Sequence, residues 1–176
     1  MKNNFFQSAA MHGLIIGLAL IVFSLLDWAL GFYGQNTMFS LLTYVIIFCG
    51  LLWAGFSYRK SVGGYISYGQ ILGYSVMVAA FFAFVSTIFS LILTNVIDPT
   101  YMDKIWELTE IKLLDMGMAE AQIDAAMEMS KKFSHPAITF ILGIISVTFI
   151  STLLALITSA IVKRNNPNPF AEQEQI

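Results

Sequence analysis

Charged residues are scarce in this sequence: Asp, Glu, Lys and Arg make up only 11% of its 176 residues, whereas hydrophobic residues make up 57%. A chain with a mean hydropathy of +0.74 has too little polar surface to cover its own apolar groups in water. The composition therefore excludes an ordinary water-soluble domain and predicts an integral membrane protein.

The sequence also lacks an excess of basic residues and has a single cysteine. Its formal net charge is −2, so it has no positive field to attract nucleic acid, and we exclude a nucleic-acid partner. Cys49 has no second cysteine with which to form an intrachain disulfide. It lies in an apolar run without neighbouring histidines or acids, so we expect an inert, buried thiol.

Motifs for catalysis and for cofactors are missing as well. The sequence contains no P-loop, G-x-S-x-G, H-E-x-x-H, C-x-x-C or dinucleotide-binding glycine pattern. The acids between residues 98 and 135 lack EF-hand spacing, and His135 has no second histidine or cysteine nearby to complete a metal site. We therefore predict no enzyme activity, no cofactor and no bound metal.

What the sequence does contain is four long apolar runs, at residues 6–30, 38–57, 67–96 and 136–162. Each is long enough to cross a hydrocarbon core about 30 Å thick as a helix. Between the second and third runs, Arg59 and Lys60 are expected in a short loop that continues through Gly63 and Gly64. Residues 1–164 are thus interpreted as one four-span membrane domain, followed by a disordered cytoplasmic tail at 165–176.

Residues 98–135 separate the third and fourth apolar runs and read as a helical hairpin outside the membrane. Asp98 and Pro99 have the pattern of an N-cap followed by proline at the first helical position, and Gly117 that of a C-cap. A second short helix follows at about 119–133, where apolar residues recur at helical spacing.

The distribution of cations predicts the orientation of the chain in the membrane. With four spans, one side receives Lys2, Arg59, Lys60, Lys163 and Arg164, while the other receives the hairpin with its eight acids and four lysines. Cytoplasmic loops carry the excess of Lys and Arg. Both termini are therefore expected in the cytoplasm and the hairpin on the opposite side.

Small residues recur where packed membrane helices need them. Gly13 and Gly17 form a small-x-x-x-small pair on the first span, and a stripe of small residues at seven-residue spacing begins at Gly69 and Gly73 on the third. The expected fold is all-α, a bundle of four antiparallel transmembrane helices with the hairpin between the third and the fourth.

Two ionisable residues lie within or at the edge of a span, where a charge is costly and a functional role has to be considered. Asp27 is one turn from the outer end of the first span, where it either points into the bundle or caps the helix at the water boundary. His12 lies near the inner end, and an interfacial or inter-helix hydrogen bond is expected there. About fifteen residues of helix, or ~22 Å, separate the two, too far for a proton relay.

The stretch Gly63, Gly64, Tyr65, Ile66, Ser67, Tyr68, Gly69 and Gln70 enters the third span, and Ile97, Asp98 and Pro99 follow at its far end. With this pattern the chain resembles the family called domain of unknown function 4199, over about residues 6–163. The resemblance implies a small four-helix protein of the bacterial inner membrane, of Bacteroidetes-type bacteria. It implies no activity or catalytic residue.

The function that the sequence favours is a non-enzymatic scaffold or accessory subunit that uses the acidic hairpin as its working surface. The motivating feature is an apolar stripe on the first hairpin helix, formed by Met102, Ile105, Trp106 and Leu113. The stripe either meets a partner or only packs on the second hairpin helix. The expected partners are the lipid bilayer and another membrane protein or a second copy of the chain. A small transporter or an oligomeric channel, with a pore formed between subunits from the faces of Thr87, Thr94 and Thr148, is the alternative.

Overall fold

The computed structural model describes residues 5–165 and is all-helical apart from one isolated bridge between Ile66 and Arg164. Four of its helices are long and apolar enough to cross a membrane, as predicted. The elements are α1 (Phe5–Ala29), α2 (Thr37–Ser61), α3 (Tyr68–Ile92) with its π-helical extension η1 (Leu93–Ile97), α4 (Tyr101–Asp115), α5 (Glu120–Lys132) and α6 (Pro136–Val162). Lys2 and all but the first residue of the predicted tail lie outside the described residues.

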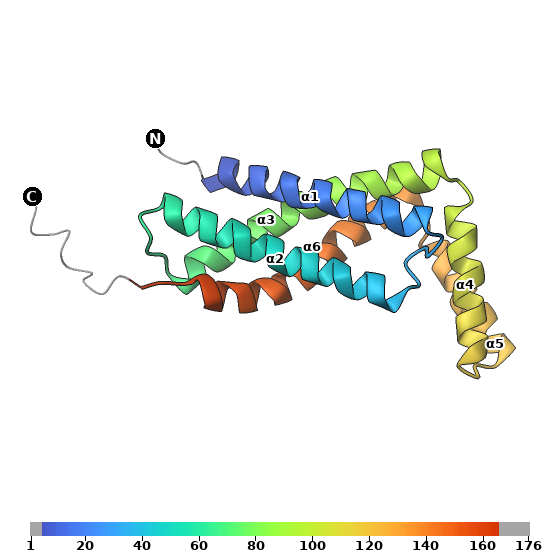
Figure 1. Ribbon diagram of the computed structural model, residues 1–176. Helices are drawn as coiled ribbons and strands as arrows, with labels where there is room; N and C mark the ends of the chain where they lie inside the picture. The colour runs from blue at the N-terminus through green and yellow to red at the C-terminus, as the bar shows by residue number, and fades with distance from the viewer. Residues whose placement is uncertain (1–4, 166–176) are drawn as a thin grey trace, which may run out of the picture.

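The four long helices lie side by side, and the two short helices α4 and α5 lie across one end of them (Figure 1). The opposite end holds the start of α1, the end of α6 and the connection between α2 and α3. The helix α3 is central, since it packs on α1, α2 and α6. Tyr74, Phe82 and Ile71 of this helix are among the largest side chains that are fully buried.

Glycines of α1 allow α3 to approach closely. A Cβ atom at Gly13 would lie 2.5 Å from Phe81 Cβ and 2.9 Å from the Val78 carbonyl oxygen, and one at Gly17 would lie 3.2 Å from Val85 Cβ. The predicted role of the α1 glycines in packing is therefore confirmed. The predicted stripe on α3 is wrong at its start, because Gly69 and Gly73 face open space. Between α1 and α3, bulky side chains of α3 therefore pack against small residues of α1.

Three local predictions need correction. Arg59 and Lys60 lie in the last turn of α2 and not in the following loop, because α2 continues to Ser61. Asp98 is not the N-cap of α4; it ends η1, and Thr100 is at the N-cap position. Cys49 is exposed on the surface of the bundle rather than buried. Gly117 does follow the C-cap of α4, with a φ of +77°.

Candidate functional site

His12 is part of a buried polar cluster between α1, α2 and α3. Its side chain is only 5% exposed, and its Nδ1 atom lies 2.8 Å from the Ser8 carbonyl oxygen and 2.9 Å from the Tyr74 hydroxyl. The Trp53 ring packs edge-on against the imidazole, with a centroid distance of 4.7 Å. His12 thus has the inter-helix hydrogen bond that was expected, with partners that hold the helices together.

Asp27 closes the turn that follows α1. Its Oδ2 atom accepts a hydrogen bond of 2.7 Å from the Gly34 backbone N–H, which is one of the two roles foreseen for this residue. The same side chain also lines a cavity between the long helices. The Asp27 side chain therefore stabilises the turn after α1 and also lines a cavity of the bundle.

The stretch from Gly63 to Gln70 prepares the start of α3. Gly63 and Gly64 have φ values of +94° and +86°, which L-residues with side chains rarely adopt. Ser67 then caps α3 in a capping box: its hydroxyl accepts from the Gln70 N–H, and Gln70 Oε1 accepts from the Ser67 N–H at 3.1 Å. The sequence at this point therefore reverses the chain and starts a helix.

The same stretch also fastens the end of α6. Ile66 and Arg164 exchange two backbone hydrogen bonds, of 2.9 and 3.0 Å, and Arg59 Nη1 donates to the Val162 carbonyl oxygen at 2.8 Å. The Tyr65 ring lies 5.4 Å from the Arg164 guanidinium, and the Tyr68 hydroxyl donates to the Leu156 carbonyl oxygen. At Gly69 no neighbouring atom lies within 4 Å of the position that a Cβ atom would take, so this glycine makes no close packing contact. These contacts, which we call the α2–α6 clasp, give the stretch a structural role.

At the opposite end, Asp98 attaches the short helices to the bundle. Its carboxylate accepts from Trp28 Nε1 at 3.0 Å and from Lys104 Nζ at 3.0 Å, and also from the Thr100 hydroxyl and N–H. The hydrogen bond from Thr100, together with those from Trp28 and Lys104, lowers the pKa of Asp98 well below its ordinary value. The carboxylate therefore remains charged and bound over a wide range of pH.

Tyr33 in the α1–α2 turn reinforces this attachment. Its φ of +48° lies in the left-handed region that residues with side chains seldom occupy. Its ring packs on Tyr101 of α4 with a centroid distance of 5.3 Å and lies 5.0 Å from Lys104 Nζ. Contacts to α4 thus compensate for an unfavourable backbone conformation.

The apolar stripe proposed as a partner surface is half-buried at all four positions, Met102, Ile105, Trp106 and Leu113. Met102 and Ile105 line a cavity of about 240 Å³ with residues from the end of α3 and the start of α6. The Trp106 ring is covered by Lys131 of α5, whose Nζ lies 5.4 Å from the ring centroid. The exposed apolar residues of α4, α5 and their connections are others: Ile111, Leu114, Met116, Met118, Met129 and Phe133.

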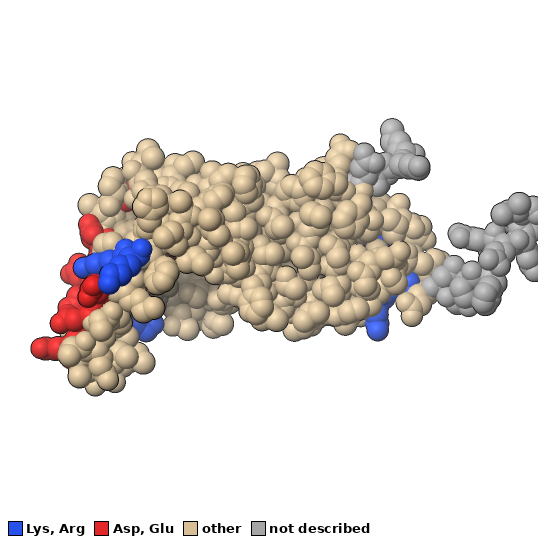
Figure 2. Space-filling view, turned by 180° about the vertical axis from the view of Figure 1, so that it is seen from behind, with Lys and Arg blue, Asp and Glu red and all other residues tan. Residues whose placement is uncertain are grey.

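Charges gather at the two ends of the molecule. The surface seen in Figure 2 has acidic and basic side chains at the end formed by α4 and α5, a few basic ones at the other end, and an uncharged zone between them. The second group comprises Arg59, Lys60, Lys163 and Arg164, and no Asp or Glu lies near them in the sequence within residues 5–165.

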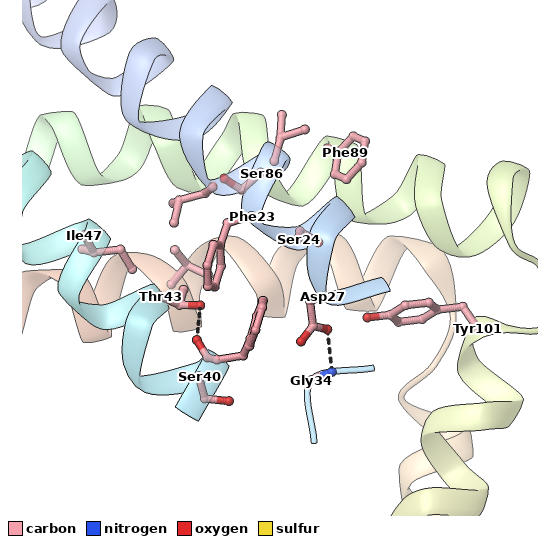
Figure 3. A pocket seen from close by; sticks show the side chains of 14 residues that line it. Phe23, Ser24, Asp27, Gly34, Ser40, Thr43, Ile47, Ser86, Phe89 and Tyr101 are labelled. Atoms are coloured by element: carbon pink, nitrogen blue, oxygen red, sulfur yellow. Dashed lines mark hydrogen bonds between the residues drawn. The ribbon is translucent and has the colours of Figure 1, made fainter. Parts of the chain in front are cut away.

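A cleft penetrates the bundle between these ends. A cavity of about 300 Å³ is lined by residues of α1, α2, α3, α4 and α6, and it has Asp27 and Tyr101 at one side (Figure 3). Sequence reasoning singled out Asp27 but missed the cleft, because the other polar residues that line it are isolated hydroxyls, most of them in apolar runs.

Of the three threonines considered for a pore between subunits, Thr87 is 6% exposed and the Thr148 hydroxyl is buried inside the protein. Thr87 lies against Gly143 of α6, where a Cβ atom would be 3.0 Å from its methyl group. Thr94 is half-buried and donates to the Ser90 carbonyl oxygen. Thr87 and the Thr148 hydroxyl are thus buried inside the bundle of a single chain and are not available on its outer surface.

Within residues 5–165 no group of three or more His, Cys, Asp or Glu side chains is arranged to hold a metal ion.

A family model described as "Protein of unknown function (DUF4199)" matches residues 11–164. The chain matches no curated protein and no solved structure.

Proposed function

The chain belongs to the DUF4199 family of proteins of unknown function, and we propose that it is a non-enzymatic scaffold or accessory subunit of the bacterial inner membrane. In this proposal the four long helices cross the membrane as an antiparallel bundle. The ends of the described chain face the cytoplasm, and α4 and α5 form a hairpin on the outer side that contacts a partner protein.

The asymmetry of charge supports this orientation. Four cations cluster where α2 and α6 end, whereas α4, α5 and their connections carry eight acids and four lysines. An excess of Lys and Arg in short loops keeps them on the cytoplasmic side. An alkaline phosphatase fusion after Met116 should therefore be active and one after Ser61 inactive. The reverse pattern would show that the orientation is wrong.

The observation that carries the function is that the hairpin is held at one end and free elsewhere. Its attachment consists of the Asp98 cluster, the rings of Tyr33 and Tyr101, and a hydrogen bond of 3.4 Å from Gln35 to Thr109. Among the helices of the described chain, α5 packs on α4 alone. A helix pair fixed in orientation but uncovered on its outer side is suited to binding a partner.

The exposed part of that surface indicates what the partner must offer. Ile111 and Leu114 are 48% and 47% exposed and lie one turn apart on α4. Glu110 and Asp124 are close by, since they line a shallow cavity together with Leu114. A partner with an apolar strip flanked by basic side chains would match both features.

Photo-crosslinking in native membranes tests the proposal, with the crosslinker placed at Met118. Replacing Ile111 and Leu114 by Ser should reduce the yield of the crosslinked partner about tenfold or more, because burial of the exposed half of each side chain is worth roughly 1 kcal/mol. Lys112→Ser, an exposed change on the same turn, serves as the control and should leave the yield unchanged. Equal yields from the double variant and the control would remove the support for the hairpin as a partner surface.

A further inference from the structure

The cleft between the long helices is larger than the cavity drawn in Figure 3 alone. A second cavity, of about 250 Å³, shares Ser40, Thr43, Ile47 and Val147 with the first one of about 300 Å³. The two are therefore parts of one cleft. Its size falls within the range of sites that bind small molecules.

The shape of the cleft is that of a slot open to the side of the bundle. Along α2 its lining runs from Phe39 to Ile47, which at 1.5 Å per residue corresponds to about 12 Å of depth. The second cavity is bordered by Tyr44 and Ile150, which are 43% and 37% exposed on the surface of α2 and α6. A chain-like molecule in the membrane can therefore enter between α2 and α6.

Two hydroxyl groups in the wall of this slot have no partner in the described protein. Ser151 is completely buried, lines the second cavity, and its Oγ atom forms no hydrogen bond. The Oγ atom of Ser86, which lines the first cavity, is also buried and unbonded. Because buried hydroxyls are nearly always hydrogen-bonded, these two groups are free to donate to an oxygen acceptor of a molecule that lies in the slot.

The end of the slot nearest α4 presents a carboxylate among aromatic rings. The Asp27 carboxylate forms no ion pair within residues 5–165, and the Gly34 N–H is the one donor of a hydrogen bond to it there. The hydroxyl of Tyr101 points toward the Asp27 carboxylate (Figure 3), and burial, followed by the negative charge of Asp27, raises the pKa of Tyr101. Phe23 and Phe39 stack at 4.8 Å beside them, and Phe89 completes the lining.

We propose that this cleft binds a membrane-borne amphiphile with an organic ammonium head group and an ester-linked chain. The head lies at Asp27, where a carboxylate and aromatic faces together favour a cation that carries apolar substituents. The chain occupies the slot along α2, and its ester group accepts a hydrogen bond from the free hydroxyl of Ser86, which lines the same cavity as Asp27. The site is distinct from the hairpin surface and does not depend on the proposed partner.

Binding of lauroylcholine to the purified full-length chain in dodecyl maltoside micelles tests this assignment by equilibrium dialysis, with empty micelles as background. Ethyl laurate lacks the charge, laurate reverses it and choline lacks the chain. We expect saturable binding of one lauroylcholine per chain and at least tenfold weaker binding of the other three. Equal affinity for laurate, ethyl laurate or choline would overturn the proposal.

Variants on two different helices locate the site. Asp27→Asn keeps an acceptor for the Gly34 N–H but removes the charge, and it should weaken lauroylcholine binding at least tenfold. Thr43→Phe fills the slot from α2 and should abolish binding, whereas Val45→Phe, at a position that is 54% exposed, should leave it unchanged. Unchanged binding by Thr43→Phe contradicts the proposal, and this comparison decides the question even if Asp27→Asn fails to fold.

Discussion

Replacing Gly13 by Ala should destabilise the bundle through the contact between α1 and α3. The added Cβ atom would lie 2.5 Å from Phe81 Cβ and 2.9 Å from the Val78 carbonyl oxygen. An ordinary contact of at least 3.4 Å requires the two helices to move apart by about 1 Å, with loss of neighbouring van der Waals contacts. Overpacking of this kind costs about 1–3 kcal/mol.

A second glycine separates this cost from the intrinsic preference of alanine for helices. Alanine is favoured over glycine inside a helix by roughly 0.5–1 kcal/mol, and this gain applies to both sites. At Gly73 of α3 no atom lies within 4 Å of the Cβ position, so Gly73→Ala should not be destabilising. The difference between the two variants therefore measures the overpacking alone, about 1–3 kcal/mol.

Reversible unfolding in mixed maltoside and dodecyl sulfate micelles, followed by circular dichroism, provides the two free energies. Gly17→Ala, with a nearest contact of 3.2 Å, should fall between the other variants. If all three unfold at the same fraction of dodecyl sulfate, α1 and α3 do not pack in the way that the structure shows.

Three further perturbations address the ends of the bundle. Ser67→Ala removes the hydroxyl of the capping box at the start of α3 and should cost about 1 kcal/mol in the same unfolding assay. Tyr74→Phe loses the hydroxyl that reaches His12 and Ser8 and should cost about 0.6–1.7 kcal/mol; Tyr58→Phe, which keeps the ring stacked at 3.9 Å on Tyr74, should cost less. Asp98 has a lowered pKa in the folded protein, so its contribution to docking of the hairpin is complete above its ordinary value of 3.8 and declines as the pH falls below this value. In a variant with Trp53 and Trp106 replaced by Phe, the emission of Trp28 should report this acid transition, and Asp98→Asn should abolish it.

The membrane helices could be predicted from the sequence because each apolar run is long in comparison with the uncertainty of its ends. The second span illustrates the limit: hydropathy ended it at residue 57, whereas α2 continues through Arg59 to Ser61. A cationic residue that follows an apolar run can still be part of the helix when a hydrogen-bond partner holds its side chain in place. For Arg59 that partner is the Val162 carbonyl oxygen, which no local pattern reveals.

Apart from the Gly13 and Gly17 face of α1, the side of each long helix that faces the protein could not be predicted. Apolar residues occur all around these helices, and lipid is as apolar as a neighbouring helix. Gly13 and Gly73 look alike in the sequence, yet only the first is in close contact. The role of Asp98 and the slot beside Asp27 were hidden for a related reason. Trp28, which binds Asp98, is 70 residues away in the chain, and the slot beside Asp27 depends on how five helices are placed.

The α2–α6 clasp has a consequence for the biosynthesis of the protein. Arg59 and Val162 are 103 residues apart, and a ribosome that adds about 10 residues per second needs roughly ten seconds to connect them. During this interval the inserted α1, α2 and α3 lack α6, and the backbone groups of Ile66 have no partner at Arg164. The bundle is completed only when its last helix arrives, so a chain truncated before Val162 would display an unfinished edge, where α2 ends, to proteases that remove incomplete membrane proteins.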